Sequence, residues 1–436
     1  MRGLTSTIVL VVVLAGLVGY IYFIDAGKPA SGTEVKAKAF DVSPENIEEV
    51  LIKNAAGETT RVQRVEANWK LVEPQQADAD AAAVASVTSS VAGLEVQRVV
   101  DENPGDVAQY GLNPPRIDVS FRVKDQKEFQ RLLVGEKTPT GGDLYAQKPG
   151  EKRVFLISSF LDGTFNKTAF DFRDKQVLKF ERDSAGGVEL VKGGTTLQLA
   201  RTGTDWTLAR PIAARADYAA VEGIMTRLSS AQMQKVVAEQ PADLKQYGLD
   251  RPSHTVTVTS GSSRATLLLG KAGDGGLYAK DASRPIVFTV EESLATDLGK
   301  DLQDFRRKEL FDSRSFSTNR LDIQRGTETL TFEKTSADGK DAWKNAAGQN
   351  VDEAKVQDLL TRLSNLRAQS FEAAPHASLK MPALAVTVLF DDKKTETVTF
   401  GRAGSDVFAS RPDEPGAARL DAAGLDEAIK ALDALK

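Results

Sequence analysis

Apolar residues recur along this chain with two spacings, and the same order of spacings appears three times. In one kind of segment they are separated by steps of three, four and three residues, which places them on one face of an α-helix. The three sets are Val84, Val87, Val91 and Leu94; Val221, Ile224, Leu228 and Ala231; and Val356, Leu359, Leu363 and Leu366. Asp80, Asp217 and Asp352 precede these sets, and an aspartate in that place is typical of a helix N-cap.

Alternating apolar and polar residues surround each expected helix and predict β-strands. Ile117, Val119 and Phe121 share one face of such a strand in the first copy. A further strand then runs into a glycine in each copy, at Gly135, Gly270 and Gly401. Strands clustered around one or two helices and repeated three times predict α+β units in tandem, built from antiparallel strands with packing helices.

The tryptophans give the repeat interval, because Trp69, Trp206 and Trp343 are separated by 137 residues twice (206 − 69 and 343 − 206). The sequence Gln-Tyr-Gly-Leu keeps the same step of 137 residues, at residues 109–112 and 246–249 (246 − 109). We therefore expect three repeat units, the third of them shorter and divergent. Their expected bounds are residues 40–175, 176–311 and 312–436.

An apolar, uncharged stretch begins the chain, from Leu4 to Ile24. Its length suits a helix that crosses a bilayer core, and Tyr20, Tyr22 and Phe23 lie at one end, where aromatic rings favour the interface. We expect residues 1–24 to be an uncleaved signal anchor in the inner membrane; the alternative is a cleaved signal peptide. Residues 25–39 read as a flexible tether, and the bulk of the chain is then periplasmic or extracellular.

Composition narrows the function classes. The net charge of −5 is spread without long runs of one sign, which gives no footprint for nucleic acid. The chain has no cysteine, so thiolate catalysis, disulfides and cysteine metal sites are excluded.

The Tyr-Gly-Leu sequence predicts a Schellman closure of a short helical turn. Gly111 takes the left-handed position and Leu112 folds back onto Val107, with prolines following. The same closure is expected in the second unit, with Leu249 on Leu244. The residues concerned are Tyr110, Gly111, Leu112, Tyr247, Gly248 and Leu249. The alternative is a ligand contact made by the exposed ring and backbone.

Two other repeated features have a structural and a binding interpretation. The three tryptophans are expected to fill the layer between strands and helix, the alternative being that they stack on sugars. Arg173 and Arg306 stand in Phe-Arg sequences at the ends of the first two units. We expect them to bond carbonyls or carboxylates across the junction between units, with an anionic ligand as the alternative.

Signatures of catalysis and cofactor binding are missing from the sequence. His254 and His376 fall at non-equivalent repeat positions without a second histidine at ligand spacing, so no zinc site is expected. Gly270-Lys271 lacks the upstream glycine of a phosphate loop, and no Gly-x-Ser-x-Gly elbow occurs. We expect no catalytic residue, cofactor or metal. Paired carboxylates that hydrolyse glycosides stay open as a hypothesis.

The tryptophan after paired strands, the Tyr-Gly-Leu-x-x-Pro turn and the Phe-Arg-x-Lys junction resemble the bacterial family called domain of unknown function 4340. The resemblance covers nearly everything after the tether, and the third copy departs from it, with His376-Ala377-Ser378-Leu379 where the turn belongs. It implies a protein anchored in the inner membrane and often encoded beside ABC transporter subunits of the kind associated with gliding motility. The family has no assigned catalytic residues.

The leading hypothesis is a non-enzymatic accessory or scaffold subunit of an ABC-type transport complex, with the permease and ATPase subunits as partners. The alternative is a periplasmic module that binds a glycan, peptide or lipid in a groove between repeat units, lined by aromatic residues such as Tyr145 and Tyr278. A third hypothesis is that the protein is an envelope hydrolase. The pattern specifies neither an oligomeric state nor a transported substrate.

Overall fold

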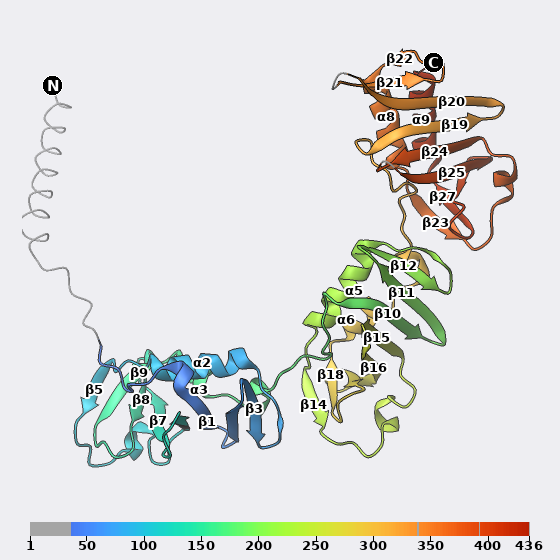
Figure 1. Cartoon of the computed structure of the whole chain (residues 1–436). Coiled ribbons are helices and arrows are strands. Elements are labelled where there is room, and N and C mark those ends of the chain that lie inside the picture. The colour runs from blue at the N-terminus through green and yellow to red at the C-terminus, as the bar shows by residue number, and fades with distance from the viewer. Residues whose placement is uncertain (1–35, 338–339, 392, 436) are drawn as a thin grey trace, which may run out of the picture. The chain divides into compact units, whose positions relative to one another are not determined.

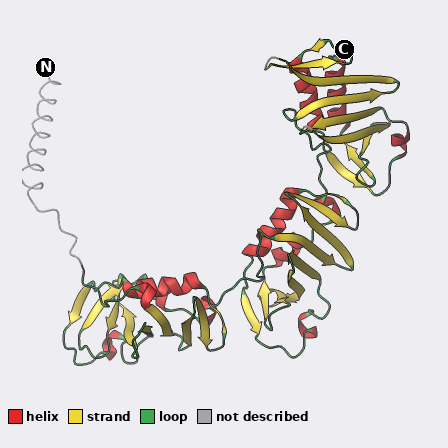
Figure 2. Cartoon of the chain, in the orientation of Figure 1, coloured by secondary structure: helices red, strands yellow, loops and turns green. Residues whose placement is uncertain are grey.

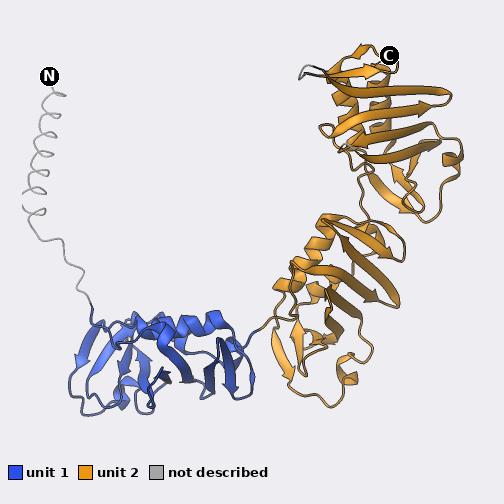
Figure 3. Ribbon diagram, in the orientation of Figure 1, with its two compact units in different colours: residues 1–174 blue, residues 175–436 orange. Residues whose placement is uncertain are grey.

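The computed structural model describes residues 36–337, 340–391 and 393–435 (Figure 1). The expected transmembrane anchor, residues 1–24, and the tether up to residue 35 lie outside the described residues. Within the described ranges, no helix combines the length and apolar character needed to cross a membrane. The chain divides into two compact units, with the boundary between Asp174 and Lys175 (Figure 3).

Each of the three repeats forms a nine-stranded antiparallel sheet with helices against one face (Figure 2). The first repeat lies in unit 1, and the second and third lie in unit 2. Strands dominate, so the expected α+β units are mainly β. The strand order is the same in all three sheets, and in the first it is β4-β3-β2-β1-β6-β7-β8-β9-β5.

The first sheet consists of β1 (Ile47–Lys53), β2 (Thr59–Val65), β3 (Asn68–Glu73), β4 (Ala77–Asp78), β5 (Arg98–Asp101), β6 (Ile117–Val123), β7 (Gln130–Lys137), β8 (Asp143–Gln147) and β9 (Val154–Ser158). Its helices are α2 (Ala81–Ala92), α3 (Leu161–Phe165) and α4 (Ala169–Phe172), with short 3₁₀ turns η2 (Pro44–Asn46) and η3 (Ala108–Tyr110).

The second sheet consists of β10 (Ala185–Lys192), β11 (Thr195–Thr202), β12 (Asp205–Arg210), β13 (Ala214–Arg215), β14 (Lys235–Ala238), β15 (His254–Ser260), β16 (Ser263–Gly273), β17 (Gly276–Asp281) and β18 (Val287–Val290). Its helices are α5 (Tyr218–Ser230), α6 (Glu292–Leu298) and α7 (Leu302–Phe305), and its 3₁₀ turn is η4 (Lys245–Tyr247).

The third sheet consists of β19 (Thr318–Arg325), β20 (Glu328–Ala337), β21 (Lys340–Asn345), β22 (Asn350–Val351), β23 (Ala368–Glu372), β24 (Leu384–Phe390), β25 (Lys394–Ala403), β26 (Asp406–Ser410) and β27 (Ala417–Leu420). Its helices are α8 (Glu353–Ser364) and α9 (Ala422–Asp433), and its 3₁₀ turn is η5 (Ala377–Lys380).

One long helix in each repeat buries its apolar stripe against the sheet. In α2 the side chains of Val84, Val87 and Val91 are fully buried, and Leu94 is buried just beyond the end of the helix. The Asp80 carboxylate accepts hydrogen bonds from the backbone N–H groups of Ala82 and Ala83, because the first N–H groups of a helix have no partner within it. Asp217 and Asp352 cap α5 and α8 in the same way.

The chain enters and leaves the repeats through extended segments that pair with the body of the fold. The incoming segments are residues 36–40, 175–178 and 308–311, and each forms a β-bridge with the stretch that follows the long helix. These bridges are Lys38 with Glu95, Gln176 with Gln232, and Glu309 with Arg367. The outgoing segments of the first two repeats, residues 172–174 and 305–307, form bridges with the residue that precedes the N-cap. These are Arg173 with Ala79 and Arg306 with Ala216.

The Tyr-Gly-Leu turn has the two hydrogen bonds of a Schellman motif. The Leu112 N–H donates to the Val107 carbonyl at 3.2 Å, and the Gly111 N–H donates to the Ala108 carbonyl at 2.9 Å. Gly111 has a φ of 69°, in the left-handed region where only glycine is free of strain. Leu249 and Gly248 make the equivalent bonds in the second repeat, to Leu244 and Lys245.

Each turn lies so close to the neighbouring strand that the strand has no room for a side chain there. A β-carbon at Gly135 would collide with the Tyr110 carbonyl oxygen, and one at Gly270 would collide with that of Tyr247. In the third repeat, Gly401 approaches the backbone and hydroxyl of Ser378 in the same manner. The glycine that ends the expected strand in all three copies is therefore required by the packing of the turn.

We predict that Gly135→Ala destabilises the first repeat by about 2 kcal/mol or more, because both the turn and β7 are backbone that must move apart. Gly111→Ala is expected to cost on the order of 1 kcal/mol through its positive φ, and more if Glu136 does not yield. Chemical denaturation followed by circular dichroism measures both.

Gly105→Ala is the matched control, because nothing lies within 4 Å of the position of its β-carbon. A Gly135→Ala protein as stable as the Gly105→Ala protein would contradict the close approach.

Candidate functional site

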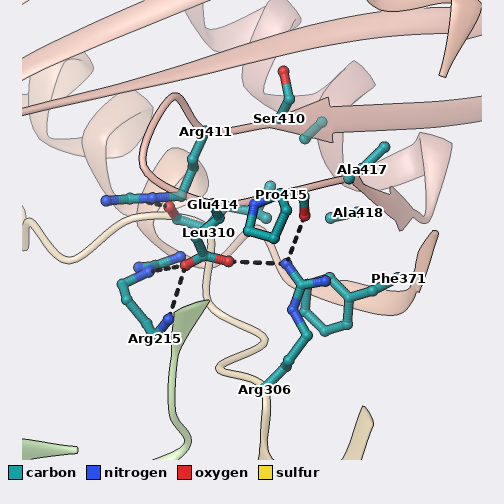
Figure 4. Close-up of a pocket in the computed structure, with 12 residues that line it drawn as sticks. Arg215, Arg306, Leu310, Phe371, Ser410, Arg411, Glu414, Pro415, Ala417 and Ala418 are labelled. Carbon is teal, nitrogen blue, oxygen red and sulfur yellow. Dashed lines mark hydrogen bonds and ion pairs between the residues drawn. The ribbon is translucent and has the colours of Figure 1, made fainter. Parts of the chain in front are cut away.

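A cluster of charged side chains lies in unit 2, where the second repeat passes into the third (Figure 4). Glu414 projects from the loop between β26 and β27, and its side chain is only 7% exposed. Its Oε1 accepts from Arg215 Nε at 2.5 Å, and its Oε2 accepts from Arg306 Nη2 at 3.0 Å. Both arginines belong to the second repeat, so one carboxylate of the third repeat joins two of its cations.

A second carboxylate, Asp312, extends this contact along the incoming segment of the third repeat. Arg215 Nη1 donates to Asp312 Oδ1 at 2.8 Å, and Arg307 Nη1 lies 2.7 Å from the same oxygen. Arg215 Nη2 also donates to the Glu309 carbonyl at 2.9 Å. The Arg215 guanidinium therefore binds the linker as well as the third repeat.

Glu396 and Arg411 fix the linker from the side of the third repeat. The Glu396 carboxylate is buried and accepts from the backbone N–H groups of Asp312 and Ser313, both at 2.8 Å. Arg411 Nη1 donates to Glu396 Oε2 at 2.8 Å and to the Leu310 carbonyl at 2.7 Å. Arg411 also donates from Nε and Nη2 to the two carboxylate oxygens of Asp413, both at 3.0 Å.

Backbone pairing explains why these side chains meet. Arg215 ends β13, and the Arg307 N–H donates to its carbonyl at 3.0 Å, which holds residues 305–307 beside β13. The Leu310 N–H donates to the Leu366 carbonyl at 3.1 Å, which holds the next few residues on the third repeat. Arg306 and Arg307 are consequently fixed within four residues of Leu310, where the chain pairs with the third repeat.

The ionic junction, defined as these eight side chains, is balanced in charge. Its members are Arg215, Arg306, Arg307, Arg411, Asp312, Glu396, Asp413 and Glu414. Burial opposes the charge of Arg411, but its hydrogen bonds to Asp413 and Glu396 prevail and raise its pKa. Burial likewise opposes ionisation of Asp413, and the Arg411 guanidinium prevails and lowers the Asp413 pKa.

The hollow beside the junction is partly open and has a volume of about 20 Å³, roughly the space of one water molecule. The Arg306 guanidinium lies over the Phe371 ring, with its central carbon 3.9 Å from the ring centroid. Its Nε is buried without a hydrogen-bond partner. The space is therefore too small for an organic ligand.

Two larger hollows lie elsewhere in unit 2, and neither is lined by Tyr145 or Tyr278. One of about 190 Å³ has mainly polar walls, including Arg227, Gln232 and Glu291. The other, of about 350 Å³, combines apolar side chains of Phe180 and Val258 with Lys179, Glu181 and Arg264. Each hollow presents a single carboxylate, so neither holds the carboxylate pair that a glycosidase requires.

Described aspartates and glutamates with a clearly shifted pKa all shift in the same direction, downward. Hydrogen bonds from cationic or polar neighbours outweigh the opposing effect of burial wherever both act. These residues are Glu151, Asp162, Glu222, Glu291, Asp322, Asp341, Asp413 and Glu427. A carboxylic acid that serves as general acid near neutral pH needs the opposite shift.

Tyr145 and Tyr278 each pair with the tyrosine of the neighbouring turn. The ring centroids of Tyr110 and Tyr145 are 4.9 Å apart, and those of Tyr247 and Tyr278 are 5.2 Å apart. Asp101 accepts from the Tyr110 hydroxyl at 3.4 Å, and burial followed by the Asp101 charge raises the Tyr110 pKa. These rings therefore attach the turn to β8 and β17.

The third repeat keeps this ring pair with different residues. His376 stacks on Phe408 with the centroids 3.7 Å apart and the planes 8° apart. The His376 Nδ1 accepts from the Ser378 N–H at 3.2 Å, which closes the turn that Gly111 and Gly248 close elsewhere. Although its sequence departs from the Tyr-Gly-Leu pattern, the third turn has the same packing partner.

The three tryptophans occupy equivalent strands, β3, β12 and β21, and are buried in the layer between sheet and helix. Trp206 Nε1 donates to Glu222 on α5 at 3.1 Å, whereas Trp343 Nε1 has no partner among the described residues. Arg173 is buried in unit 1, at the bridge with Ala79.

No group of three or more histidine, cysteine, aspartate or glutamate side chains in the described ranges is arranged to hold a metal ion. His254 and His376 lie in separate repeats, as the sequence indicates. The His254 Nε2 is buried without a partner, and its Nδ1 lies 3.1 Å from Ser253 Oγ.

Sequence reasoning missed Arg215, Glu396, Arg411 and Glu414. They lie in a strand end, a strand and a loop, where charged residues show no period. One signal for Glu414 was present in the sequence. When Tyr278 is aligned with Phe408, Glu414 takes the same loop position as Arg284 of the second repeat. Arg284 donates to the Gln176 and Val177 carbonyls of its own incoming segment.

We predict that Glu414→Gln destabilises unit 2 by about 3 kcal/mol, because it removes the anion that pairs with the buried Arg306 guanidinium and one of the two anions that pair with Arg215. Urea denaturation of the full chain measures the loss. Combination with Arg306→Gln is expected to cost less than the sum of the single changes, since the remaining partner is then removed as well.

Asp406→Asn is the control, because it breaks an exposed pair with Arg419 and is expected to cost less than about 1 kcal/mol. Equal effects of Glu414→Gln and Asp406→Asn would show that the junction does not carry this energy.

Stability is also expected to fall in acid through His254. Burial, and then the charge of Lys192, lower the His254 pKa below its ordinary value. The unfolded chain therefore takes up the proton first as the pH drops, and the contribution of His254, present above about pH 6.5, is lost as the pH falls through the lowered pKa. His254→Gln should flatten this part of a pH–stability curve, and an unchanged slope would refute the assignment.

Comparison with solved structures matches the chain to DNA polymerase sliding clamps from Pseudomonas aeruginosa. A ligand-bound clamp is 10% identical, covers 87% of this chain and 92% of its own, and has a TM-score of 0.17. Another is 9% identical, covers 88% and 94%, and has a TM-score of 0.15. Such low TM-scores carry no argument about fold or function. No curated protein matches the chain.

The family described as "Domain of unknown function (DUF4340)" matches residues 69–207 and 206–382. These matches begin at Trp69 and Trp206, in step with the repeat of the tryptophans, and together they span more than half of the chain. The chain belongs to the DUF4340 family.

Proposed function

We propose that this protein is a non-enzymatic accessory or scaffold subunit of an ABC-type transport complex, anchored in the inner membrane through residues 4–24. The ionic junction is the observation that carries the proposal. The junction joins the third repeat to the second through eight charged side chains, and each of these charges is paired with an opposite charge of the protein. Such a site holds neighbouring repeats at a fixed spacing and leaves no group for substrate chemistry.

The apolar start of the chain supports the membrane anchor, because its length matches a bilayer core. The ABC transporter as partner follows from the family resemblance stated above. A tandem array on a membrane anchor suits a subunit that positions other proteins, since repeats of the same fold present similar surfaces.

A ligand-binding module is the second candidate, and the hollow of about 350 Å³ in the second repeat favours it. Its volume falls within the range of small-molecule sites, and Phe180 and Val258 provide apolar contact beside Lys179 and Arg264. An amphipathic anion is the ligand class that this lining suits.

The test is affinity purification of the full chain from crosslinked membranes, with Met1–Ile24 intact, followed by mass spectrometry. We expect an ABC permease and its nucleotide-binding subunit to be enriched above background. Glu414→Gln should lower their recovery at an equal level of the bait, because the third repeat is no longer held in place, while Asp406→Asn should not. Recovery of this protein alone would contradict the scaffold proposal and would favour the ligand-binding module with its hollow of about 350 Å³.

A further inference from the structure

The first two repeats close the same sheet edge with their own outgoing segments. In the first, the Asp80 N–H donates to the Phe172 carbonyl at 2.8 Å, and the Asp174 N–H donates to the Asp78 carbonyl at 2.9 Å. In the second, the Asp217 N–H donates to the Phe305 carbonyl at 2.8 Å, and the Arg307 N–H donates to the Arg215 carbonyl at 3.0 Å. An apolar residue followed by arginine therefore occupies the edge in both cases.

The third repeat has the same edge, formed by β22 and the N-cap of α8. Trp343 pairs with Val351 and Lys344 pairs with Asn350, in the register that Thr207 and Arg215 show in the second repeat. The inner side of β22 is thereby occupied. Its outer side presents the Asn350 carbonyl and the Asp352 N–H, the counterparts of the groups that bind the outgoing segments elsewhere.

No segment in the described part of the chain forms a bridge with the outer side of β22 (Figure 1). Asp352 is exposed, whereas Asp80 and Asp217 are half-buried under their outgoing segments. A single helix, α9, follows the last strand in place of two short helices, and the N–H of Leu435 donates to Leu432 within the end of that helix. As far as the described residues go, the edge is thus unpaired backbone beside exposed acidic side chains, Asp352 and Glu353.

We propose that the outer edge of β22 binds an extended segment of another protein chain that carries an apolar residue followed by arginine. The segment adds antiparallel to β22, accepts from the Asp352 N–H through the carbonyl of its apolar residue, and donates to the Asn350 carbonyl two residues later. Exposed sheet edges bind extended peptides in this way, and the first two repeats show which peptide fits.

The biological role of this site rests on the proposed scaffold function, because the open edge of β22 would be where the scaffold binds a partner protein. The edges in the first two repeats do not compete for the same segment, because their occupants are part of the same chain and have a high effective concentration.

The probe is a fluorescent peptide with the sequence of residues 300–309, which contains Phe305 and Arg306. Its binding to the purified full chain is measured by fluorescence anisotropy. We expect saturable binding that is lost when the peptide carries Arg307→Pro, because proline lacks the N–H that donates to the carbonyl of the strand. This comparison uses the unaltered chain and so does not depend on the folding of a variant.

Asp352 allows a matched pair of chain variants. Its φ of −63° suits proline, so Asp352→Pro removes the N–H without forcing the backbone, and Asp352→Ala removes the same capping carboxylate but keeps the N–H. We expect Asp352→Pro to bind the peptide about tenfold more weakly than Asp352→Ala, as the loss of one hydrogen bond to a bound carbonyl implies.

Absence of saturable binding to the unaltered chain, or equal affinities of the Asp352→Pro and Asp352→Ala proteins, would overturn the proposal. Equal binding of the Arg307→Pro peptide would overturn it as well. The affinity purification from membranes does not involve the peptide, so the two experiments can fail independently. If the peptide does not bind but the permease is recovered, only the proposed edge site is refuted. If the peptide binds but the permease is not recovered, only the proposed role in a transport complex is refuted.

Discussion

Glu414 brings one negative charge into a site where two arginines of the preceding repeat are themselves largely buried, and the continuity of unit 2 depends on that pairing. A buried charge without a partner costs several kcal/mol, so each member of the ionic junction holds the others in position. Because Asp312 and Glu396 bind the linker backbone and its arginines, the connection between repeats is fixed as well as their surfaces. A flexible linker would need none of these contacts.

Backbone pairing organises the rest of the array. Each incoming segment forms a bridge with the stretch after the long helix, and the outgoing segments of the first two repeats close the edge before it. One stretch of chain therefore completes one sheet and begins the next within a few residues. Because the same short stretch serves both sheets, repeats of nine strands follow one another without long linkers. At the corresponding edge of the third repeat, a strand of another chain can pair with β22.

The sequence predicted local features well, because each depends on residues close together in the chain. The stripe of α2 with its Asp80 cap and the glycine of the Schellman turn are examples. The expected strand ends at Gly135 and Gly270 were misplaced, because β7 and β16 continue past these glycines. The balance of the expected α+β units was less accurate, because several short strands such as β4 and β5 have too few residues to show an alternation.

The ionic junction could not be predicted from the sequence, because its members come from a strand end, a linker, a central strand and a loop. Charged residues in such places are mostly solvated, and only the fold brings Arg215 to within 2.5 Å of Glu414, 199 residues away. The same limit applies to His376, which takes the place of a tyrosine by stacking on Phe408. His376 and the tyrosines of the first two turns are equivalent in how their rings stack, which their residue types do not reveal.

The most direct measurement is the distance between the second and third repeats in solution. The chain has no cysteine, so Ala219→Cys and Ala354→Cys, at equivalent exposed positions of α5 and α8, accept spin labels without interference. Pulsed electron paramagnetic resonance of the doubly labelled protein should give one narrow distance distribution, and Glu414→Gln should broaden it. A broad distribution in the unaltered protein, or one that Glu414→Gln leaves unchanged, would contradict the account.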